Sequence, residues 1–410
     1  MSSDARLDAR LHDLVRDEVE AGADALVALR RDLHAHPELS WHETRTTTVV
    51  AERLEALGWR VERLAGSGLV ADLGERDARP VVGLRADIDA LPVQETTGDP
   101  WTSTVPGVAH ACGHDVHTTA LVGAAGALAR LHAEGLLPGR VRLFFQPAEE
   151  VMPGGALRLI GLGLLDGVDR VFALHCDPGV DVGQVGLRLG PMTSAADQVD
   201  VRLEGTGGHT SRPHLTGDLT FALAKVTTEL PAILSRRFDP RAGVSVVWGR
   251  IEAGRAPNVI PERGLLSGTV RILDAIAWAD AEKLVRELVH EIVRPYGVTA
   301  HVDYVRGVPP VVNEPVSHAV LAEAVASVLG PDGRVLAPQS LGGEDFGWYV
   351  DEVPGAMMRL GTRTPGGATY DLHQGDLRVD ERAIGLGARL LAEAAARALR
   401  LPGKHASRQA

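Results

Sequence analysis

The sequence is poor in several kinds of residue, and each scarcity excludes a class of protein. Two cysteines in 410 residues cannot form a disulfide framework, so both thiols are free for other chemistry in a reducing compartment. Basic residues are in the minority, with 42 Lys and Arg against 54 Asp and Glu and a formal net charge of -12. Because the chain also lacks a dense Lys/Arg block, we expect no nucleic-acid partner.

Long apolar runs are missing as well. The first residues, "MSSDARLDARLHDLVRDEVEAG", are charged and polar and lack the apolar region of a signal peptide. No later stretch is long and uncharged enough to span a bilayer, so we expect a cytoplasmic protein without a membrane partner. The chain does have 45% hydrophobic residues, enough for a large core and, at ordinary domain sizes, for two domains.

The order of the predicted elements indicates an α/β protein with an insert. From residue 20 to 190, amphipathic helices alternate with short apolar runs, which predicts a mostly parallel sheet with helices on both faces. Between 190 and 305 the pattern changes to half-exposed antiparallel strands and two long helices, a smaller α+β domain. We therefore expect a main domain in two parts, 1–189 and 306–410, with a second domain inserted at 190–305.

Polar residues collect where strands of the main domain are predicted to end. Three such clusters stand in the sequence: Asp87 with Asp89, Glu149 with Glu150, and His175. In open α/β sheets, ligands bind outside the carboxyl ends of the strands. These residues should therefore converge although they are distant in the sequence.

The densest cluster is "HACGHDVHTT", residues 110 to 119. Cys112 and His114 are two residues apart and cannot share a helix face, so they belong in a loop or at a helix start if both touch one ion. Thiolate, imidazole and carboxylate together form a ligand set for a divalent metal, with zinc the plainest case and manganese, nickel or cobalt open. The alternative is that Cys112 is a small buried residue. His110 and His117 either orient ligands or simply pack.

The stretch "FFQPAEE" places two adjacent carboxylates directly after a strand. Neighbouring residues point in different directions, so Glu150 can hold a metal while Glu149 handles protons, the division of labour that metal-assisted hydrolysis needs. His373, in the late loop "YDLHQGD", and His175 are further ligand candidates. An exposed acidic loop and two core histidines are the alternatives.

The inserted segment has candidates of its own. His209 lies in the glycine-rich turn "GTGGHTSRPH", from which an imidazole can project outside its own domain. Asn258 and Arg271 offer an amide and a guanidinium that could hold a carboxylate, although Arg271 could equally be a surface strand residue. Glu344 and Asp345 are interpreted as a helix cap rather than site residues. Other histidines fall on predicted helix or loop surfaces and are interpreted as structural: His34, His36, His42, His132, His290, His301 and His318.

The motifs together resemble a known family. "RADIDALP", "HACGHDVHT", "FQPAEE", "LHC", "GGHTSRPH", "NVIPE", "GGEDF" and a late "LH" occur in the order found in metal-dependent amidohydrolases and carboxypeptidases. That family includes hippurate hydrolase, the indole-3-acetyl-amino-acid hydrolases and N-acetyl-diaminopimelate deacetylase. The resemblance covers residues 25 to 400 and implies a catalytic domain like that of the zinc peptidases.

The resemblance also implies roles for individual residues. Glu149 matches the general acid/base. Asp89 matches a residue that orients ligands, and Asp87 is not expected to bind an ion, since other branches carry His-x-Asp where this chain has Asp87-Ile88-Asp89. The residues that would bind two divalent ions are Cys112, His114, Glu150, His175 and His373.

In the family, the inserted domain is a lid that also forms a homodimer interface, so residues 190–305 are expected to dimerise. His209 matches a residue that reaches into the partner subunit's site and polarises the scissile carbonyl, and Asn258 and Arg271 match positions that hold the substrate's carboxylate. The chain departs from the family at Val116 and Thr119, where Gly and Ala are expected, and these changes affect the shape of the acyl pocket.

The resulting hypothesis is hydrolysis of the amide bond of N-acyl amino acids, with water activated at a two-metal site. A dipeptidase or carboxypeptidase with the same site is the alternative within enzymes. A metal-binding protein without catalysis is the alternative outside them, and the presence of Glu149 speaks against it. With aromatic residues at 4% of the chain, a large aromatic acyl group is not favoured.

Overall fold

The computed structural model describes residues 3–402, which belong to two compact units. The first unit is made of Met1–Gly190, Val312–Pro338 and Trp348–Ala410, and the second of Pro191–Val311 and Gln339–Gly347. The second unit thus begins beside the expected boundary at 190, runs past the expected 305 to Val311, and takes in a later segment as well. Each unit is described separately.

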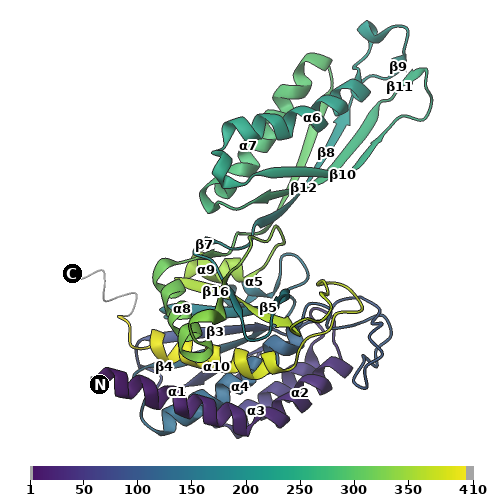
Figure 1. Cartoon of the computed structure of the whole chain (residues 1–410). Coiled ribbons are helices and arrows are strands. Elements are labelled where there is room, and N and C mark those ends of the chain that lie inside the picture. Colours follow the sequence, from purple (N-terminus) through teal and green to yellow (C-terminus); the bar gives the residue numbers. More distant parts are fainter. Residues whose placement is uncertain (1–2, 403–410) are drawn as a thin grey trace. The chain divides into compact units, whose positions relative to one another are not determined.

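The first unit is built on an eight-stranded sheet with strand order β1-β2-β4-β3-β5-β16-β6-β15. Figure 1 labels its strands β3, β4, β5 and β16. Neighbours from β4 to β16 are parallel, whereas β1–β2, β2–β4 and β16–β6 are antiparallel. The sheet is therefore mixed, and the expected parallel arrangement is confirmed for its centre. The strands are β1 (Arg60–Arg63), β2 (Leu69–Leu73), β3 (Val81–Asp87), β4 (Arg140–Gln146), β5 (Arg170–Asp181), β6 (Val185–Leu187), β15 (Arg334–Leu336) and β16 (Gly355–Arg363).

Short connections explain two of the three antiparallel pairs. β5 ends at Asp181 and β6 begins at Val185, a link too short for a crossover helix, so β6 runs opposite to β5. It therefore also runs opposite to β16, the parallel neighbour of β5 with which β6 pairs. The same holds for the link from β1 to β2. The central strands are joined through longer segments that contain helices, and they are buried on both faces, as the all-buried pattern of β3 shows.

Helices cover both faces of this sheet. Leu84, Leu143 and Leu174 point to one face and join the main core, where α4 and α10 pack on the strands. On the opposite face, the ring of Phe144 in β4 meets Tyr349 in α9 at a centroid distance of 5.5 Å. The helices are α1 (Ser3–Ala21), α2 (Ala23–Ala35), α3 (Thr44–Ala56), α4 (His114–Ala133), α5 (Gly155–Gly161), α8 (Pro315–Leu329), α9 (Phe346–Glu352) and α10 (Arg382–Ala398).

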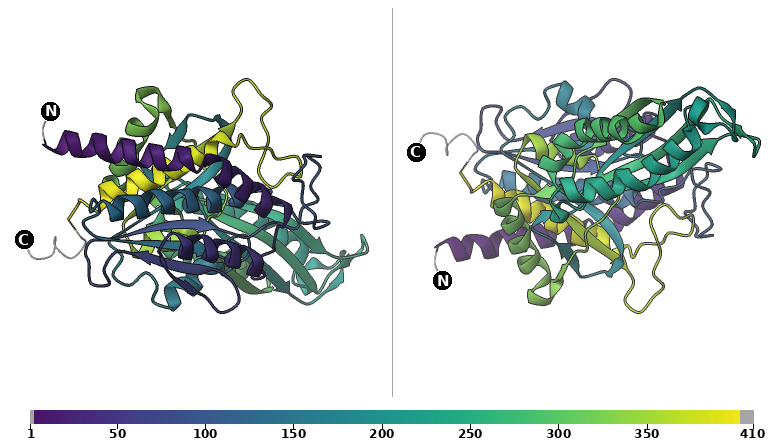
Figure 2. Two further views of the ribbon diagram at one scale, coloured as in Figure 1. Left: turned by 90° about the horizontal axis from the view of Figure 1, so that it is seen from below. Right: turned by 90° about the horizontal axis from the view of Figure 1, so that it is seen from above.

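Helix α1 was not expected from the sequence. Most of its residues are charged or polar, so the apolar stripe of Leu11, Val15 and Val19 is not conspicuous in the sequence. This stripe is buried against α4 and α10. The three helices lie side by side in Figure 2, left. None of the helices within residues 3–402 has the length and apolarity needed to cross a bilayer.

The second unit has an antiparallel sheet of order β10-β12-β8-β13, with α6 and α7 packed on it. Strand β13 was not anticipated, although its burial alternates along most of its length as a half-exposed strand should. The elements are β8 (Ala195–Glu204), β9 (Gly208–His209), α6 (Leu219–Arg237), β10 (Ser245–Ala253), β11 (Val259–Ile260), β12 (Arg263–Ile272), α7 (Ala275–Val293) and β13 (Thr299–Val308). Two further short strands, β7 (Gly190–Pro191) and β14 (Val312–Asn313), lie where the chain passes between the units.

Candidate metal centre

The predicted ligands of the first unit converge near the ends of β3 and β4. His175 was expected at a strand end but lies within β5 (Arg170–Asp181), just past Ala173, where the pairing of β5 with β3 stops. The loop after β3 leads to Cys112, and α4 starts at His114. Gly113 between them is left-handed, with φ 85°, and a Cβ there would lie 2.9 Å from the Cys176 sulfur. Only glycine fits this turn, which lets the thiol and the imidazole approach the same point.

Two groups of potential ligand atoms share one thiol. Cys112, His114 and His175 offer atoms that lie within 4.8 Å of one another, and so do Cys112, Glu150 and His373. A further group of the same kind joins His114, Glu149 and Glu150. The structure therefore brings together every residue of the first unit that the sequence suggested for metal binding or proton transfer. Those residues are Cys112, His114, Glu149, Glu150, His175 and His373.

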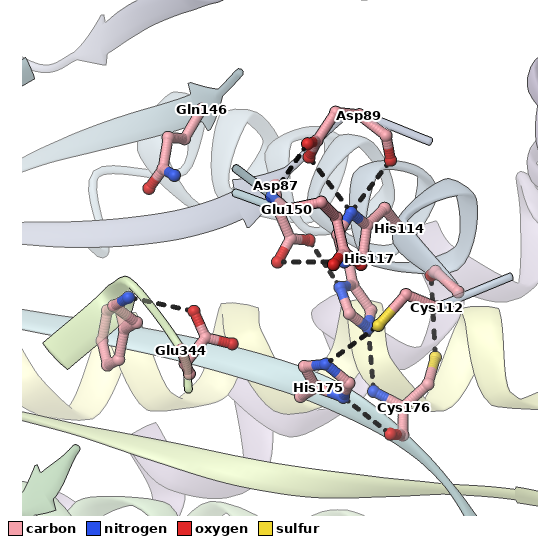
Figure 3. Close-up of polar contacts among 12 residues, drawn as sticks. Asp87, Asp89, Cys112, His114, His117, Gln146, Glu150, His175, Cys176 and Glu344 are labelled. Carbon is pink, nitrogen blue, oxygen red and sulfur yellow. Dashed lines mark hydrogen bonds and ion pairs between the residues drawn. The ribbon is translucent and has the colours of Figure 1, made fainter. Parts of the chain in front are cut away.

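The two buried histidines present the same nitrogen to this centre (Figure 3). His114 Nδ1 donates to the Asp89 carbonyl oxygen at 2.9 Å, and His175 Nδ1 donates to the Cys176 carbonyl oxygen at 2.7 Å. Each Nε2 lone pair is therefore left for another partner. Nε2 of His175 lies 3.5 Å from the Cys112 sulfur, and Nε2 of His114 lies 3.7 Å from Glu150 Oε1.

Two of these atoms are buried without a hydrogen bond. Among the residues that the structure describes, His114 Nε2 and Glu150 Oε1 make no hydrogen bond of good geometry, although His373 Nε2 lies 3.3 Å from Glu150 Oε1. Such a pair is costly unless something else satisfies it. A divalent cation would do so, and thiolate, imidazole and carboxylate are the donors that zinc and similar ions take. The residues present thus fit a metal centre.

Burial sets the protonation states around the centre. It raises the pKa of the Cys112 thiol well above its usual range, so the sulfur would release a proton on binding an ion. Burial, together with Arg359 and His117 nearby, lowers the pKa of His175 well below its usual value. The imidazole of His175 is therefore neutral and ready to donate its Nε2 lone pair.

Asp89 touches two of the candidate ligands. Its backbone oxygen holds His114, as described, and its Oδ2 accepts from the Glu150 backbone N–H at 3.0 Å. Ser40 donates to the same oxygen at 2.7 Å. The buried carboxylate thus fixes the backbone of one candidate ligand while its main chain fixes the ring of the other.

Asp87 forms a separate contact with His117. Their atoms Oδ1 and Nδ1 are 2.6 Å apart, and His117 Nε2 accepts from the Cys176 backbone N–H at 2.8 Å. Burial alone would raise the pKa of Asp87, but Arg85, His114 and His117 outweigh it and hold the pKa well below its usual value. A carboxylate already paired with Arg85, at 2.6 Å, is a poor candidate for an ion.

His373 comes to the centre from an exposed loop. Its backbone is left-handed, with φ 62°, and its N–H donates to the Ala111 carbonyl oxygen at 2.7 Å. Its Nε2 lies 3.3 Å from Glu150 Oε1, and this contact raises the pKa of His373. The loop therefore closes on the residue just before Cys112.

One expectation was wrong: His34 is not on the surface. It is buried, with Nδ1 at 2.8 Å from Asp115 Oδ2 and Nε2 at 3.1 Å from Glu95 Oε1. Arg30 reaches the same Asp115 oxygen at 2.7 Å. The position of His34 at the end of a helix followed by proline gave no sign of these partners, since both come from distant segments. The sequence held one indirect signal, the motif "HD" at 114–115. If Asp115 is buried at the start of a helix, it needs a cationic partner, and His34 and Arg30 are those partners.

The remaining predicted residues belong to the second unit. His209 lies in β9, and the next residue, Thr210, donates its N–H to the Asn258 carbonyl oxygen at 3.2 Å. Arg271 lies near the far end of β12, opposite Ala196 of β8. The structure therefore makes His209 and Asn258 neighbours and sets Arg271 apart from them within this unit.

Comparison with known proteins adds the family. A model described as peptidase family M20/M25/M40 matches residues 83–397. The chain belongs to this family. As an M20 enzyme it is a metal-dependent amidohydrolase or peptidase that hydrolyses C–N bonds.

Three relatives of this M20 chain are informative. It is 36% identical to an N-acetyl-L-cysteine deacetylase of Bacillus subtilis, covering 91% of the chain and 88% of the relative. It is 35% identical to thermostable carboxypeptidase 2 of Saccharolobus solfataricus, covering 92% and 96%. It is 50% identical over 92% of its length to a Rhodococcus jostii protein that carries the name of a glutamate–cysteine ligase, but spans only 47% of that protein.

Solved structures agree with the fold of this M20 chain. A dinuclear metal-binding peptidase of the M20 family from Bacillus subtilis superposes with a TM-score of 0.80 and 31% identity, covering 93% of this chain and 99% of that one. A Staphylococcus aureus protein named as an aminohydrolase gives a TM-score of 0.87 at 31% identity, covering 95% and 100%.

Proposed function

We propose that this M20 enzyme hydrolyses the amide bond of N-acyl amino acids. The observation that carries the proposal is the pair of ligand groups that share Cys112, with Glu149 beside them. The ligand groups supply a place for metal, and Glu149 supplies a carboxylate for proton transfer. Amide hydrolysis needs both.

Five residues would hold two divalent ions, whether zinc, manganese, cobalt or nickel. When bound, such ions polarise the scissile carbonyl and lower the pKa of water. Asp89 orients Glu150 and His114 through the contacts described above, and so keeps two of the donors in place. The donors are Cys112, His114, Glu150, His175 and His373.

Glu149 moves the proton. Its carboxylate takes a proton from the attacking water and delivers it to the leaving nitrogen as the C–N bond breaks, so that acid and amine form together. The adjacent Glu150 faces His114, so one short stretch of backbone carries both the proton-transfer group and a ligand. That is why two consecutive glutamates serve different roles.

The second unit is proposed to act as a lid and as a dimer interface. His209 would polarise the carbonyl in the partner subunit's site, and Asn258 and Arg271 would hold the substrate's carboxylate. Support comes from the motifs of residues 205–214 and 256–262 and from the position of His209 at the end of the short strand β9, where the residue is exposed.

Small acyl groups on cysteine are the first substrates to try. One relative is named as a deacetylase of N-acetyl-L-cysteine. Another, which contains a similar stretch, is named as a ligase that uses cysteine as a substrate. Carboxypeptidase relatives favour peptides as the second candidate. The experiment is a panel of N-acetyl, N-benzoyl and N-formyl amino acids against dipeptides. A kcat/KM higher for dipeptides than for every N-acyl amino acid would overturn the proposal.

A further inference from the structure

We propose that Glu43 is a positioning residue for the acid/base Glu149. The proposal rests on the function proposed above. Glu43 is fully buried just before α3, and its carboxylate does not cap its own helix. Its Oε1 instead accepts from the Ala148 backbone N–H at 2.8 Å, and Ala148 immediately precedes Glu149 in the chain.

The backbone that Glu43 holds is an unusual one. Ala148 has φ 55°, a left-handed conformation that residues with a Cβ rarely adopt, and it is fully buried. Its carbonyl oxygen accepts from the Gly155 N–H at 2.9 Å. A strained conformation of this kind persists only where its surroundings fix it. The Glu43 hydrogen bond is one of the contacts that do so.

The reversal at Ala148 lies between two anchors. Glu43 fixes the Ala148 N–H on one side of Glu149. On the other side, Asp89 fixes the Glu150 N–H at 3.0 Å, and Figure 3 shows this second contact. Glu149 is therefore the residue between two backbone groups that are each held by a buried carboxylate. Loss of the Glu43 anchor should move Glu149 while Asp89 still holds Glu150.

Glu43 is itself firmly placed. Ser67 donates to its Oε2 at 2.6 Å, and the Thr47 hydroxyl donates to its backbone carbonyl oxygen at 2.5 Å. Burial raises the pKa of Glu43, and the hydrogen bonds only partly offset this effect. A neutral amide should therefore be a close substitute for this side chain at the same site.

The chain offers a matched control in Glu38, which precedes the same helix. Glu38 accepts from the backbone N–H groups of Arg45 at 2.9 Å and Thr46 at 2.8 Å, and so caps α3. Glu38→Ala removes two backbone hydrogen bonds there without touching the segment that carries Glu149. It separates damage to the helix from displacement of Glu149.

The test compares kcat, KM, metal content and the pH profile of kcat/KM for Glu43→Ala, Glu43→Gln and Glu38→Ala. We expect Glu43→Ala to lower kcat by about 10- to 100-fold and to shift the acidic limb of the profile, while KM and metal content stay within about threefold. Glu43→Gln should keep kcat within about threefold, because its amide oxygen accepts from Ala148 and its NH2 donates to Ser67. Glu38→Ala should keep wild-type kcat.

Two outcomes would overturn the proposal. One is a kcat for Glu43→Ala equal to that of Glu38→Ala. The other is a kcat for Glu43→Gln as low as that of Glu43→Ala. If Glu43→Ala does not fold, Glu43→Asp replaces it, since the shorter side chain withdraws the acceptor and should lower kcat in the same way.

Hydrogen exchange separates this proposal from the proposed function. The Ala148 amide should be protected in the wild type and exchange faster in Glu43→Ala than in Glu38→Ala, whether or not any substrate is found. Inactivity of the wild type on the whole panel would refute the proposed function alone. Unchanged protection at Ala148 would refute the role of Glu43.

Discussion

At the residue scale, the candidate centre has one sulfur that two groups of potential ligands share. Cys112 is the chain's only thiol in those groups, and the other cysteine, Cys176, is buried beside it. Cys112 was predicted as a ligand from the thiol, imidazole and carboxylate groups gathered in residues 110–119 and from the family resemblance. His34 could not be predicted in this way, because its partners Asp115 and Glu95 come from other segments of the chain.

Cys112→Ala should weaken zinc binding by more than ~100-fold. That is a larger loss than the one caused by removing a residue that only hydrogen-bonds to a metal ligand. Cys176→Ala, the matched removal of the second thiol, should bind zinc like the wild type. Calorimetric titration of chelator-treated protein measures both. Because burial raises the pKa of Cys112, wild-type affinity should also fall as the pH falls, since protons compete with the ion. Equal affinities for the two variants would contradict this account.

Glu149→Gln should keep its metal and lose activity. General acid–base groups contribute about 10²- to 10⁴-fold, so we expect kcat to fall by that amount with metal content unchanged. Elemental analysis and steady-state kinetics on the same sample test the two parts separately. Near wild-type turnover would show that another group transfers the proton.

At the element scale, the sequence predicted the helices and strands whose patterns are regular and missed those whose signals depend on neighbours. Helix α1 was missed because its charged residues obscure an apolar stripe that only α4 and α10 bury. The reversals at β1–β2 and at β6 follow from the short loops 64–68 and 182–184, and the sequence does not mark the strand ends that set these loop lengths. The left-handed conformation at Ala148 was also not predicted, because such a conformation is usually indicated by a glycine and this position has none.

His34 connects helix α2 to the start of α4 through its contact with Asp115. Its removal should lower the free energy of unfolding by an amount that depends on pH. Burial alone would lower the pKa of His34, but Asp115 and Glu95 outweigh it and raise it, while Arg30 opposes them. Protonated His34 therefore stabilises the fold fully at pH values below its pKa in the unfolded chain, which is about 6.5. This stabilisation is lost as the pH rises through its higher pKa in the folded protein. His110, whose pKa burial lowers to about 4, is the other titratable ring facing this group.

We therefore expect His34→Gln to lower the free energy of unfolding by about 1.5–3 kcal/mol at pH 6, with the loss shrinking above pH 6.5. His36→Gln, an exposed histidine just after the same helix, should change it little at either pH. Urea unfolding across this range is the measurement. A loss that grows with pH would mean that His34 is neutral in the fold.

At the scale of the whole molecule, the proposed lid requires a second copy of the chain. If His209 acts in the partner subunit's site, inactive His209→Ala and inactive Glu149→Gln chains should complement each other when mixed after refolding. Random pairing gives half hybrids with one complete site each, so activity should recover to about a quarter of the wild-type value. No recovery, or a fully active monomer by sedimentation, would show that His209 does not act across subunits.

The central claim is that the cluster around Cys112 holds the metal that hydrolysis needs. Its most direct test is metal content measured together with hydrolysis of N-acetylcysteine, before chelation, after it, and after zinc, manganese, cobalt or nickel is returned. The account predicts two ions per chain and activity that is lost and regained with them. A folded, thiol-reduced protein that binds no metal, or hydrolysis that survives its complete removal, would contradict it.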